Sequence, residues 1–223
     1  MRGFARDAAG NQVMADASRE REGVKRDVQR IVDIFFVVSL MPIWAPILGL
    51  ALLAIWLTAG RPVFFTQVRM GLRGSPFRIF KLRTMHDGAA APENALFEGW
   101  TYANDPRVTR VGSWLRRYRV DELPQLINIL RGEMSLVGPR PEPLEIAERL
   151  GTEIGDYHNR HEVRPGLTGL CQISAVYRDF GTVEKSARKL ELDLEYVRRR
   201  SVWLDLRIML GTARVILTGQ GMS

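Results

Sequence analysis

The feature that most constrains the fold is a run of 25 uncharged, mostly apolar residues from 34 to 58. A straight helix needs about 20 residues to cross the hydrocarbon core of a bilayer, so this run is long enough to span one. It lacks the short apolar core and the A-x-A-like cleavage site of a secretory signal peptide. The sequence therefore predicts a membrane-embedded segment.

Pro46 lies at the middle of this run, and Pro42 lies one turn earlier. An internal proline removes a backbone hydrogen bond, so we expect the helix to break at Pro46. Basic residues flank both ends of the run, and flanks rich in Lys and Arg prefer the cytoplasm. Two topologies stay open: a kinked spanning helix, and a re-entrant helix hairpin with both ends on the cytoplasmic face.

The remaining sequence divides around this segment. Residues 1–18 are small and polar and predict a disordered tail, ahead of a membrane-associated region over residues 19–60. Residues 61–223 predict a compact cytosolic domain. Within it, residues 62–85 predict a short β-hairpin around a glycine turn, and residues 183–218 predict amphipathic helices, some at the membrane interface. The predicted fold class is α+β, mainly helical.

The charge distribution indicates an anionic partner. The chain has 32 Lys+Arg against 25 Asp+Glu, a formal charge of +7. Six basic residues and no acidic one lie between residues 60 and 86, and five arginines lie between residues 107 and 120. The partner could be nucleic acid, an acidic membrane surface or a phosphorylated substrate. Cys171 is the single cysteine, so an intrachain disulfide is excluded and a reducing, cytosol-facing location is favoured.

Two adjacent carboxylates, Asp121 and Glu122, directly follow the second basic run. An apolar stripe typical of a helix comes next, and Asp is among the best residues to cap a helix N-terminus. A helix N-terminus also attracts phosphate oxygens. Because cations favour the charged form of a carboxylate, we expect both groups to stay ionised and the pKa of Asp121 to be depressed. They are therefore either a structural cap or groups that act on a phosphate.

A short proline-rich motif, Gly138-Pro139-Arg140-Pro141, follows this helix. Prolines on both sides restrict the backbone about Arg140, so its planar guanidinium can be presented at low entropic cost. Arginine suits paired phosphate oxygens better than lysine does.

Four motifs occur in a fixed order behind the apolar run: F-R-I-F-K-L-R-T-M at residues 77–85, D-E-L-P-Q at 121–125, M-S-L-V-G-P-R-P at 134–141 and R-P-G-L-T-G at 164–169. In this combination the chain resembles the small monotopic bacterial sugar transferases, the polyprenyl-phosphate phosphoglycosyl transferases that begin the assembly of surface glycans. The resemblance runs from about residue 30 to the C-terminus.

This resemblance implies transfer of a sugar 1-phosphate from a UDP-sugar to undecaprenyl phosphate, with release of UMP and a requirement for Mg²⁺, at the cytoplasmic face of a bacterial inner membrane. It implies that Asp121 is the nucleophile and carries a covalent phosphosugar, and that Glu122 is its partner in the dyad and the metal site. The candidate substrate-binding residues are Lys81, Arg83, Arg119, Arg140 and Arg164, and the membrane hairpin carries Arg30, Asp33 and Pro46.

Two other functions stay open. A metal-dependent phosphohydrolase would use the same carboxylates with water as the acceptor, and a membrane-tethered nucleic-acid-binding protein would use the basic runs. The carboxylate pair would repel a polyanion, and no nucleic-acid fold signature is recognisable, so we expect no nucleic acid partner. The expected partners are a UDP-sugar, undecaprenyl phosphate and membrane lipids. The identity of the sugar and the oligomeric state, a homodimer included, stay open.

Overall fold

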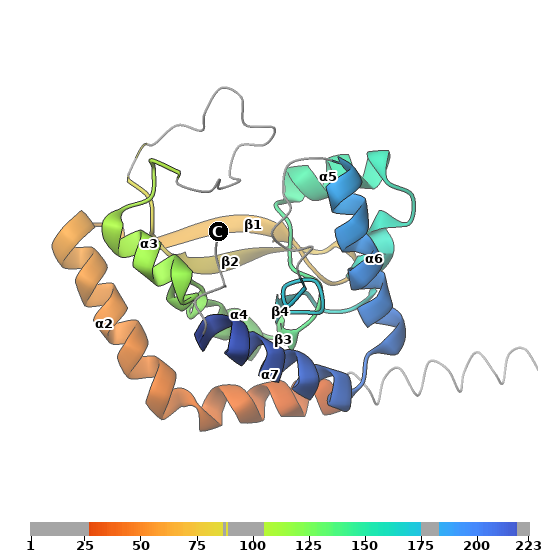
Figure 1. Cartoon of the computed structure of the whole chain (residues 1–223), viewed down its shortest axis with the longest axis horizontal. Coiled ribbons are helices and arrows are strands. Elements are labelled where there is room, and N and C mark those ends of the chain that lie inside the picture. The colour runs from red at the N-terminus through yellow and green to blue at the C-terminus, as the bar shows by residue number, and fades with distance from the viewer. Residues whose placement is uncertain (1–26, 87, 89–104, 175–182, 218–223) are drawn as a thin grey trace, which may run out of the picture.

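The computed structural model of the chain describes residues 27–86, 88, 105–174 and 183–217. The tail predicted over residues 1–18 lies outside them. Two small two-stranded sheets and several helices lie within the angle formed by the two N-terminal helices (Figure 1). The predicted mainly helical character, with a small antiparallel sheet, is confirmed.

The apolar run forms two helices. A first helix over residues 27–39 ends at a turn, and α2 (Met41–Ala59) continues at an angle to it (Figure 1). The break lies at Leu40, whose φ of −90° and ψ of 1° are not helical. Pro46 lies inside α2, so the prediction of a break at Pro46 was wrong.

Pro42 explains the position of the break. A proline is tolerated in the first turn of a helix, where its missing N–H would have no intrahelical acceptor. Pro42 occupies that turn of α2. The Trp44 side chain donates from Nε1 to the carbonyl oxygen of Val37 at 2.8 Å, which satisfies one acceptor at the break. Pro46 removes one further N–H, and α2 continues through it.

The first helix is bound to the rest of the protein near its start. Arg30 donates to the carbonyl oxygens of residues 129 and 130, the second at 2.5 Å. Asp33 is buried and accepts from the Ser135 hydroxyl at 3.1 Å and from the Leu136 N–H at 2.9 Å. Two of the three predicted hairpin residues, Arg30 and Asp33, therefore join this helix to the domain that follows.

The end of α2 is bound to the same domain. Arg83 donates to the carbonyl oxygens of Ala59 and Gly60, the second at 3.0 Å. Between the two attachment points, Val37 and Ile55 are each 2% exposed and belong to hydrophobic clusters shared with the domain. Both ends of the apolar segment therefore rest on one folded body.

The predicted β-hairpin is confirmed. Strand β1 (Phe64–Met70) pairs antiparallel with β2 (Pro76–Leu82). A 3₁₀ turn (Leu72–Gly74) joins them, and Arg73 adopts a left-handed conformation there, with φ of 54°. Strand β2 packs against α4 (Gln125–Arg131). The hairpin therefore carries its basic residues to the segment that holds the two carboxylates.

A second two-stranded sheet was not predicted. Strand β3 (Ser135–Val137) pairs in parallel with β4 (Gly166–Thr168). Gly138 lies so close to Gly166 that a Cβ on Gly166 would be 2.1 Å from the Gly138 nitrogen. Glycine is needed at position 166 because of this close approach of two backbones. The pairing fixes the point where the proline-rich motif begins.

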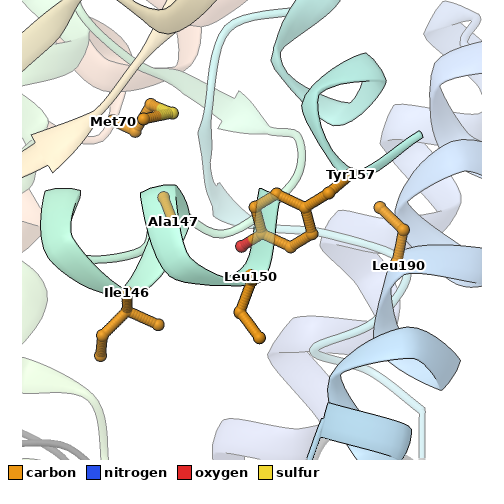
Figure 2. Packing of buried hydrophobic residues seen from close by; sticks show 6 residues of the cluster. All are labelled: Met70, Ile146, Ala147, Leu150, Tyr157 and Leu190. Atoms are coloured by element: carbon orange, nitrogen blue, oxygen red, sulfur yellow. The ribbon is translucent and has the colours of Figure 1, made fainter. Parts of the chain in front are cut away.

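The other helices pack around these sheets. They are α3 (Arg110–Arg117), α5 (Leu144–Glu153), a 3₁₀ helix (Tyr157–Glu162), α6 (Val183–Arg199) and α7 (Val202–Leu217). Helices α5 and α6 enclose one of the hydrophobic clusters (Figure 2). Its buried members are Met70, Ile146, Ala147, Leu150, Tyr157 and Leu190.

Large apolar side chains are exposed on the first helix, α2 and α7. In α7, Trp203 is 82% exposed and Leu210 is 73% exposed. By length and composition α2 could cross a membrane. The Gln29 side chain donates to Asp205 at 3.3 Å, which places the start of α7 beside the first helix. These apolar faces indicate a membrane or partner surface, and the helices predicted after residue 183 are confirmed as helices.

Candidate active site

Asp121 and Glu122 lie in a 3₁₀ turn (Val120–Glu122) between α3 and α4. Arg119 leads into this turn with φ of 54°, an uncommon conformation for a residue other than glycine. Helix α4 begins after Pro124, and the described residues provide no side-chain cap there. The interpretation of Asp121 as a helix cap was therefore wrong. Both carboxylates are buried, with 8% and 6% of each residue exposed.

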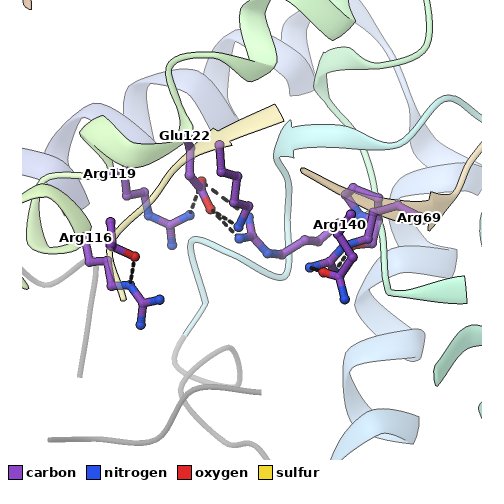
Figure 3. A network of polar contacts seen from close by, with 9 residues as sticks. Arg69, Arg116, Arg119, Glu122 and Arg140 are labelled. Atoms are coloured by element: carbon purple, nitrogen blue, oxygen red, sulfur yellow. Dashed lines mark hydrogen bonds and ion pairs between the residues drawn. The ribbon is translucent and has the colours of Figure 1, made fainter. Parts of the chain in front are cut away.

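Glu122 is surrounded by cations. Arg140 donates to both of its carboxylate oxygens, Lys81 lies 3.3 Å from Oε1, and Arg119 lies 3.6 Å from Oε2 (Figure 3). These cations come from β2, from the entry to the 3₁₀ turn and from the proline-rich motif. Two cations distant in sequence, Lys81 and Arg140, and one local cation, Arg119, therefore converge on one carboxylate.

The pKa of Glu122 follows from this arrangement. Burial alone would raise it, but the charges of Arg140, Lys81 and Arg119 outweigh burial and hold the pKa of Glu122 well below its usual range. A buried carboxylate with this many charged hydrogen-bond partners stays ionised at neutral pH. The expectation of an ionised carboxylate is met at Glu122.

Asp121 behaves differently. Burial, and next the negative charge of Glu122, raise the pKa of Asp121, while Lys81, Arg116 and Arg140 offset part of this rise. The expectation of a depressed pKa for Asp121 was wrong, because burial and the charge of Glu122 outweigh the effect of the nearby cations. Two adjacent carboxylates whose pKa values are pushed apart are typical of a pair with divided chemical roles.

Arg116 is a site residue that the sequence did not single out. Its Nε donates to the Thr84 hydroxyl at 2.7 Å, and its charge is among those that favour the ionised form of Asp121 (Figure 3). Its place in the second basic run was visible in the sequence. Its bond to Thr84 was not, because the two residues lie 32 positions apart in the sequence.

Comparison with known proteins places this geometry in a family. The family model described as Bacterial sugar transferase matches residues 24–219. The chain belongs to the bacterial sugar transferase family. The dyad, the basic hairpin and the proline-rich motif all lie inside the matched region, so they are features of the sugar transferase domain itself.

Several curated sugar transferases are similar over most of this chain. A UDP-glucose:undecaprenyl-phosphate glucose-1-phosphate transferase of Caulobacter vibrioides is 43% identical over 190 residues, which cover 85% of this chain and 70% of that protein. A protein of Escherichia coli with the same name is 41% identical, covering 84% of this chain and 39% of its own length. The exopolysaccharide production protein PSS of Rhizobium leguminosarum is 38% identical, covering 87% and 98% respectively.

The sugar transferase domain brings together three of the five predicted substrate-binding residues. Lys81, Arg119 and Arg140 meet at Glu122, as described above. Arg83, just after β2, is bound instead to the carbonyl of Gly60 at the end of α2. Arg164 donates from Nε to the carbonyl oxygen of Gly132 at 2.9 Å. The charge of Arg164 lowers the pKa of Asp33, at the junction with the first helix, and so opposes the rise caused by burial. Substrate binding by Arg83 and Arg164 stays a prediction.

Among the described residues, no group of three or more His, Cys, Asp and Glu side chains forms a metal cluster. Asp121 and Glu122 are nevertheless a suitable donor pair for one kind of ion. Mg²⁺ commonly binds through one or two carboxylates and fills its remaining positions with water and substrate phosphates.

Proposed function

We propose that this bacterial sugar transferase moves a sugar 1-phosphate from a UDP-sugar to undecaprenyl phosphate and releases UMP. The observation that carries the proposal is the asymmetry of the buried dyad, in which Glu122 holds three cations and Asp121 keeps a raised pKa beside them. The names of the relatives support the same donor and acceptor. The lipid-linked product would start a surface glycan such as an exopolysaccharide, a capsule or an O-antigen.

In the first step a carboxylate oxygen of Asp121 attacks the β-phosphorus of the UDP-sugar. The bond from that phosphorus to the bridging oxygen breaks, and UMP leaves with the oxygen and its electron pair. The product is an acyl phosphate, a mixed anhydride between the Asp121 carboxylate and the sugar phosphate. Glu122 keeps Lys81 and Arg140 in place, and their charges offset the negative charge that builds up on the phosphoryl oxygens.

In the second step an oxygen of undecaprenyl phosphate attacks the same phosphorus, and the Asp121 oxygen leaves as a carboxylate. The two steps use one site in turn, so UMP departs before the lipid acceptor reacts. Asp121 and Glu122 would hold a magnesium ion, which supplies charge neutralisation at the diphosphate. Arg116, Lys81 and Arg140 favour the ionised Asp121 that this attack needs.

The test is UMP release by the purified protein in lipid vesicles that contain undecaprenyl phosphate. With a panel of UDP-sugars, we expect one to give UMP and lipid-linked sugar in equal amounts, and EDTA to stop both until Mg²⁺ is restored. Without any lipid acceptor, no more than one UMP per protein is expected, and continued turnover to UMP under those conditions would indicate a phosphohydrolase. Salt-sensitive retention on DNA without UMP release would indicate a nucleic-acid-binding protein. Either of these outcomes would contradict the proposal.

The value of kcat/KM is expected to fall on the alkaline side with an apparent pKa near 8. Burial lowers the pKa of Lys81 to about 8, although the charge of Glu122 opposes this. As the pH rises through that value, Lys81 loses the charge that offsets the phosphoryl oxygens, and kcat/KM reports the free enzyme. The variant Lys81→Arg keeps a charge, so its alkaline limb should move to higher pH. A limb that stays in place would assign the titration to another group.

The effect of Lys81 on stability has the opposite sign. An unfolded lysine stays protonated up to a pKa of 10.5, whereas folded Lys81 loses its proton near 8. Between these values the unfolded chain binds more protons, so the contribution of Lys81 to the free energy of unfolding rises with pH. Activity and this contribution to stability therefore change in opposite directions over the same pH range.

The membrane topology that fits these contacts is re-entrant. A helix that crosses the hydrocarbon core has its ends about 30 Å apart on opposite sides of the bilayer. Here Arg30 and Asp33 attach one end, and Arg83 attaches the other, to the same domain. The two helices would enter the cytoplasmic leaflet of the inner membrane and return, with the turn at Leu40 deepest and the active site at headgroup level.

Cysteine labelling tests this topology. In a Cys171→Ala background, a cysteine in place of Ser18 and one in place of the exposed Ser113 are expected to react with a membrane-impermeant maleimide only in inverted vesicles. Because Ser113 lies on α3, it reports the side of the catalytic domain. Labelling at position 18 in intact cells, with position 113 protected, would show a spanning helix.

A further inference from the structure

The proline-rich motif is held through its carbonyl groups. Pro139, Pro141 and Pro143 have no N–H, so this stretch has few backbone donors of its own. Each of four consecutive carbonyl oxygens accepts a hydrogen bond from another segment. The bonds are Gly166 N to Pro139 O at 2.9 Å, Arg160 Nη2 to Arg140 O at 2.9 Å, Arg69 Nη1 to Pro141 O at 3.0 Å and Met70 N to Glu142 O at 3.1 Å.

The two donors nearest Arg140 are guanidinium groups. Arg160 lies in the 3₁₀ helix after α5 and is 5% exposed. Asp193 of α6 accepts from its Nε at 3.0 Å and its Nη2 at 2.6 Å, and the Tyr157 hydroxyl accepts from its Nη1 at 2.9 Å. All the nitrogens of Arg160 are therefore used, and the direction of the bond to Arg140 is set by α6.

Arg69 donates to the next carbonyl, that of Pro141. It lies on β1, and its Nη2 donates to the Gln67 side chain at 2.7 Å, so its orientation is also fixed (Figure 3). Its bond to the Pro141 carbonyl and the adjacent Met70 bond tie the end of the motif to the hairpin that carries Lys81. The backbone at and just after Arg140 is thus bound by the 3₁₀ helix through Arg160 and by β1 through Arg69 and Met70.

The burial of the Arg160–Asp193 ion pair does not by itself indicate that the pair stabilises the fold. Removing two charges from water costs several kcal/mol per ion, and apolar residues of similar volume often stabilise a fold as well or better. What an apolar pair could not do is donate to the Arg140 carbonyl. The bidentate bond from Arg140 to Glu122 needs the guanidinium plane in one orientation, and such geometry is lost when the backbone beneath it shifts.

We infer that Arg69 and the Arg160–Asp193 pair are positioning residues, which act on the reaction by holding the Arg140 backbone so that its guanidinium stays on Glu122. This inference rests on the proposed function, because the three residues would affect the reaction only through Arg140, whose charge would offset that of the phosphoryl oxygens. None of the three residues touches the reacting atoms in this role.

A double-mutant cycle tests the inference. Asp193→Asn removes the negative charge that orients Arg160, and we expect kcat for UMP release to fall about tenfold, with less change in KM for the UDP-sugar. In an Arg140→Gln background the same substitution is expected to change kcat less than about twofold, because the group it positions is gone. Thermal unfolding in both backgrounds is the companion measurement. A merely structural role would lower kcat by the same factor in both.

Control variants sharpen the cycle. Glu195→Gln removes an exposed ion pair with Arg199 on the same helix, and we expect kcat to be unchanged. If Asp193→Asn does not fold, Arg69→Gln replaces it in the same cycle. Equal losses of kcat in the two backgrounds, or no loss in the wild-type background, would overturn the inference. A wild type that releases no UMP would refute the proposed function alone, and the cycle would then be read from the affinity for UDP.

Discussion

Replacing Asp121 by asparagine is expected to stop sugar-phosphate transfer while leaving the fold at least as stable. The nucleophilic oxygen is lost, and removal of a residue that carries the covalent intermediate typically lowers kcat by about a thousandfold or more. Stability should not fall, because burial and Glu122 already disfavour a charge at Asp121. An asparagine of the same size removes that unfavourable charge.

Two measurements check this expectation. UMP release with undecaprenyl phosphate gives the loss of activity, and thermal unfolding gives the change in stability. With UDP-sugar labelled at the β-phosphorus and no lipid acceptor, the wild type is expected to retain label on the protein, and Asp121→Asn is expected to retain none. Asp156→Asn is the matched control, since Asp156 is exposed and its φ of 60° suits asparagine equally well. Full activity of Asp121→Asn would remove the proposed nucleophile.

Glu122→Gln is expected to have the largest effect on stability. Glutamine keeps the shape of the side chain but leaves Lys81, Arg119 and Arg140 without the charge that they share. Removing one partner from a buried ion pair typically costs about 3–5 kcal/mol in the free energy of unfolding. Activity should fall as well, because the cations are then free to move away from the phosphoryl group.

Chemical denaturation of the variant measures this cost. Glu153→Gln serves as the control, because it breaks the Arg149–Glu153 pair on α5, whose side chains are 50% and 33% exposed. An exposed pair of this kind contributes about 1 kcal/mol or less. Equal changes in the two variants would mean that the cluster around Glu122 is screened by solvent, contrary to its burial. The pair Asp121→Asn and Glu122→Gln thus separates two adjacent carboxylates, one expected to limit chemistry and the other expected to support the fold.

Local sequence patterns located most of the elements and the dyad. Strands β1 and β2 are readable because a glycine turn separates two apolar-rich runs, and α4 is readable because its apolar stripe stops at Gly132, whose φ of 81° requires a residue tolerant of that conformation. The break in the apolar run was misplaced because two prolines compete. Pro42, in the first turn of α2, sets the start of the helix, whereas Pro46, inside it, removes only one backbone hydrogen bond.

The properties that sequence reasoning missed depend on contacts through space. The pKa of Asp121 depends first on its burial and next on the charge of Glu122, set against the nearby cations. Spacing along the chain does not reveal how deeply the side chain is buried. Strands β3 and β4 have three residues each and pair in parallel, with Ser135 opposite Gly166, 31 positions later. Local sequence patterns therefore do not predict them. Arg160 and Asp193 lie 33 positions apart and each looks like an ordinary surface charge in the sequence.

The attachment of both N-terminal helices to the domain limits how this enzyme can be engineered. Val37 and Ile55 contribute to the same hydrophobic clusters as residues of β2, α3 and α4, so the two N-terminal helices are part of the interior of the folded domain. Swapping them for an unrelated anchor would remove packing partners from the interior. A version of this transferase that lacks the two helices would therefore need its interior redesigned.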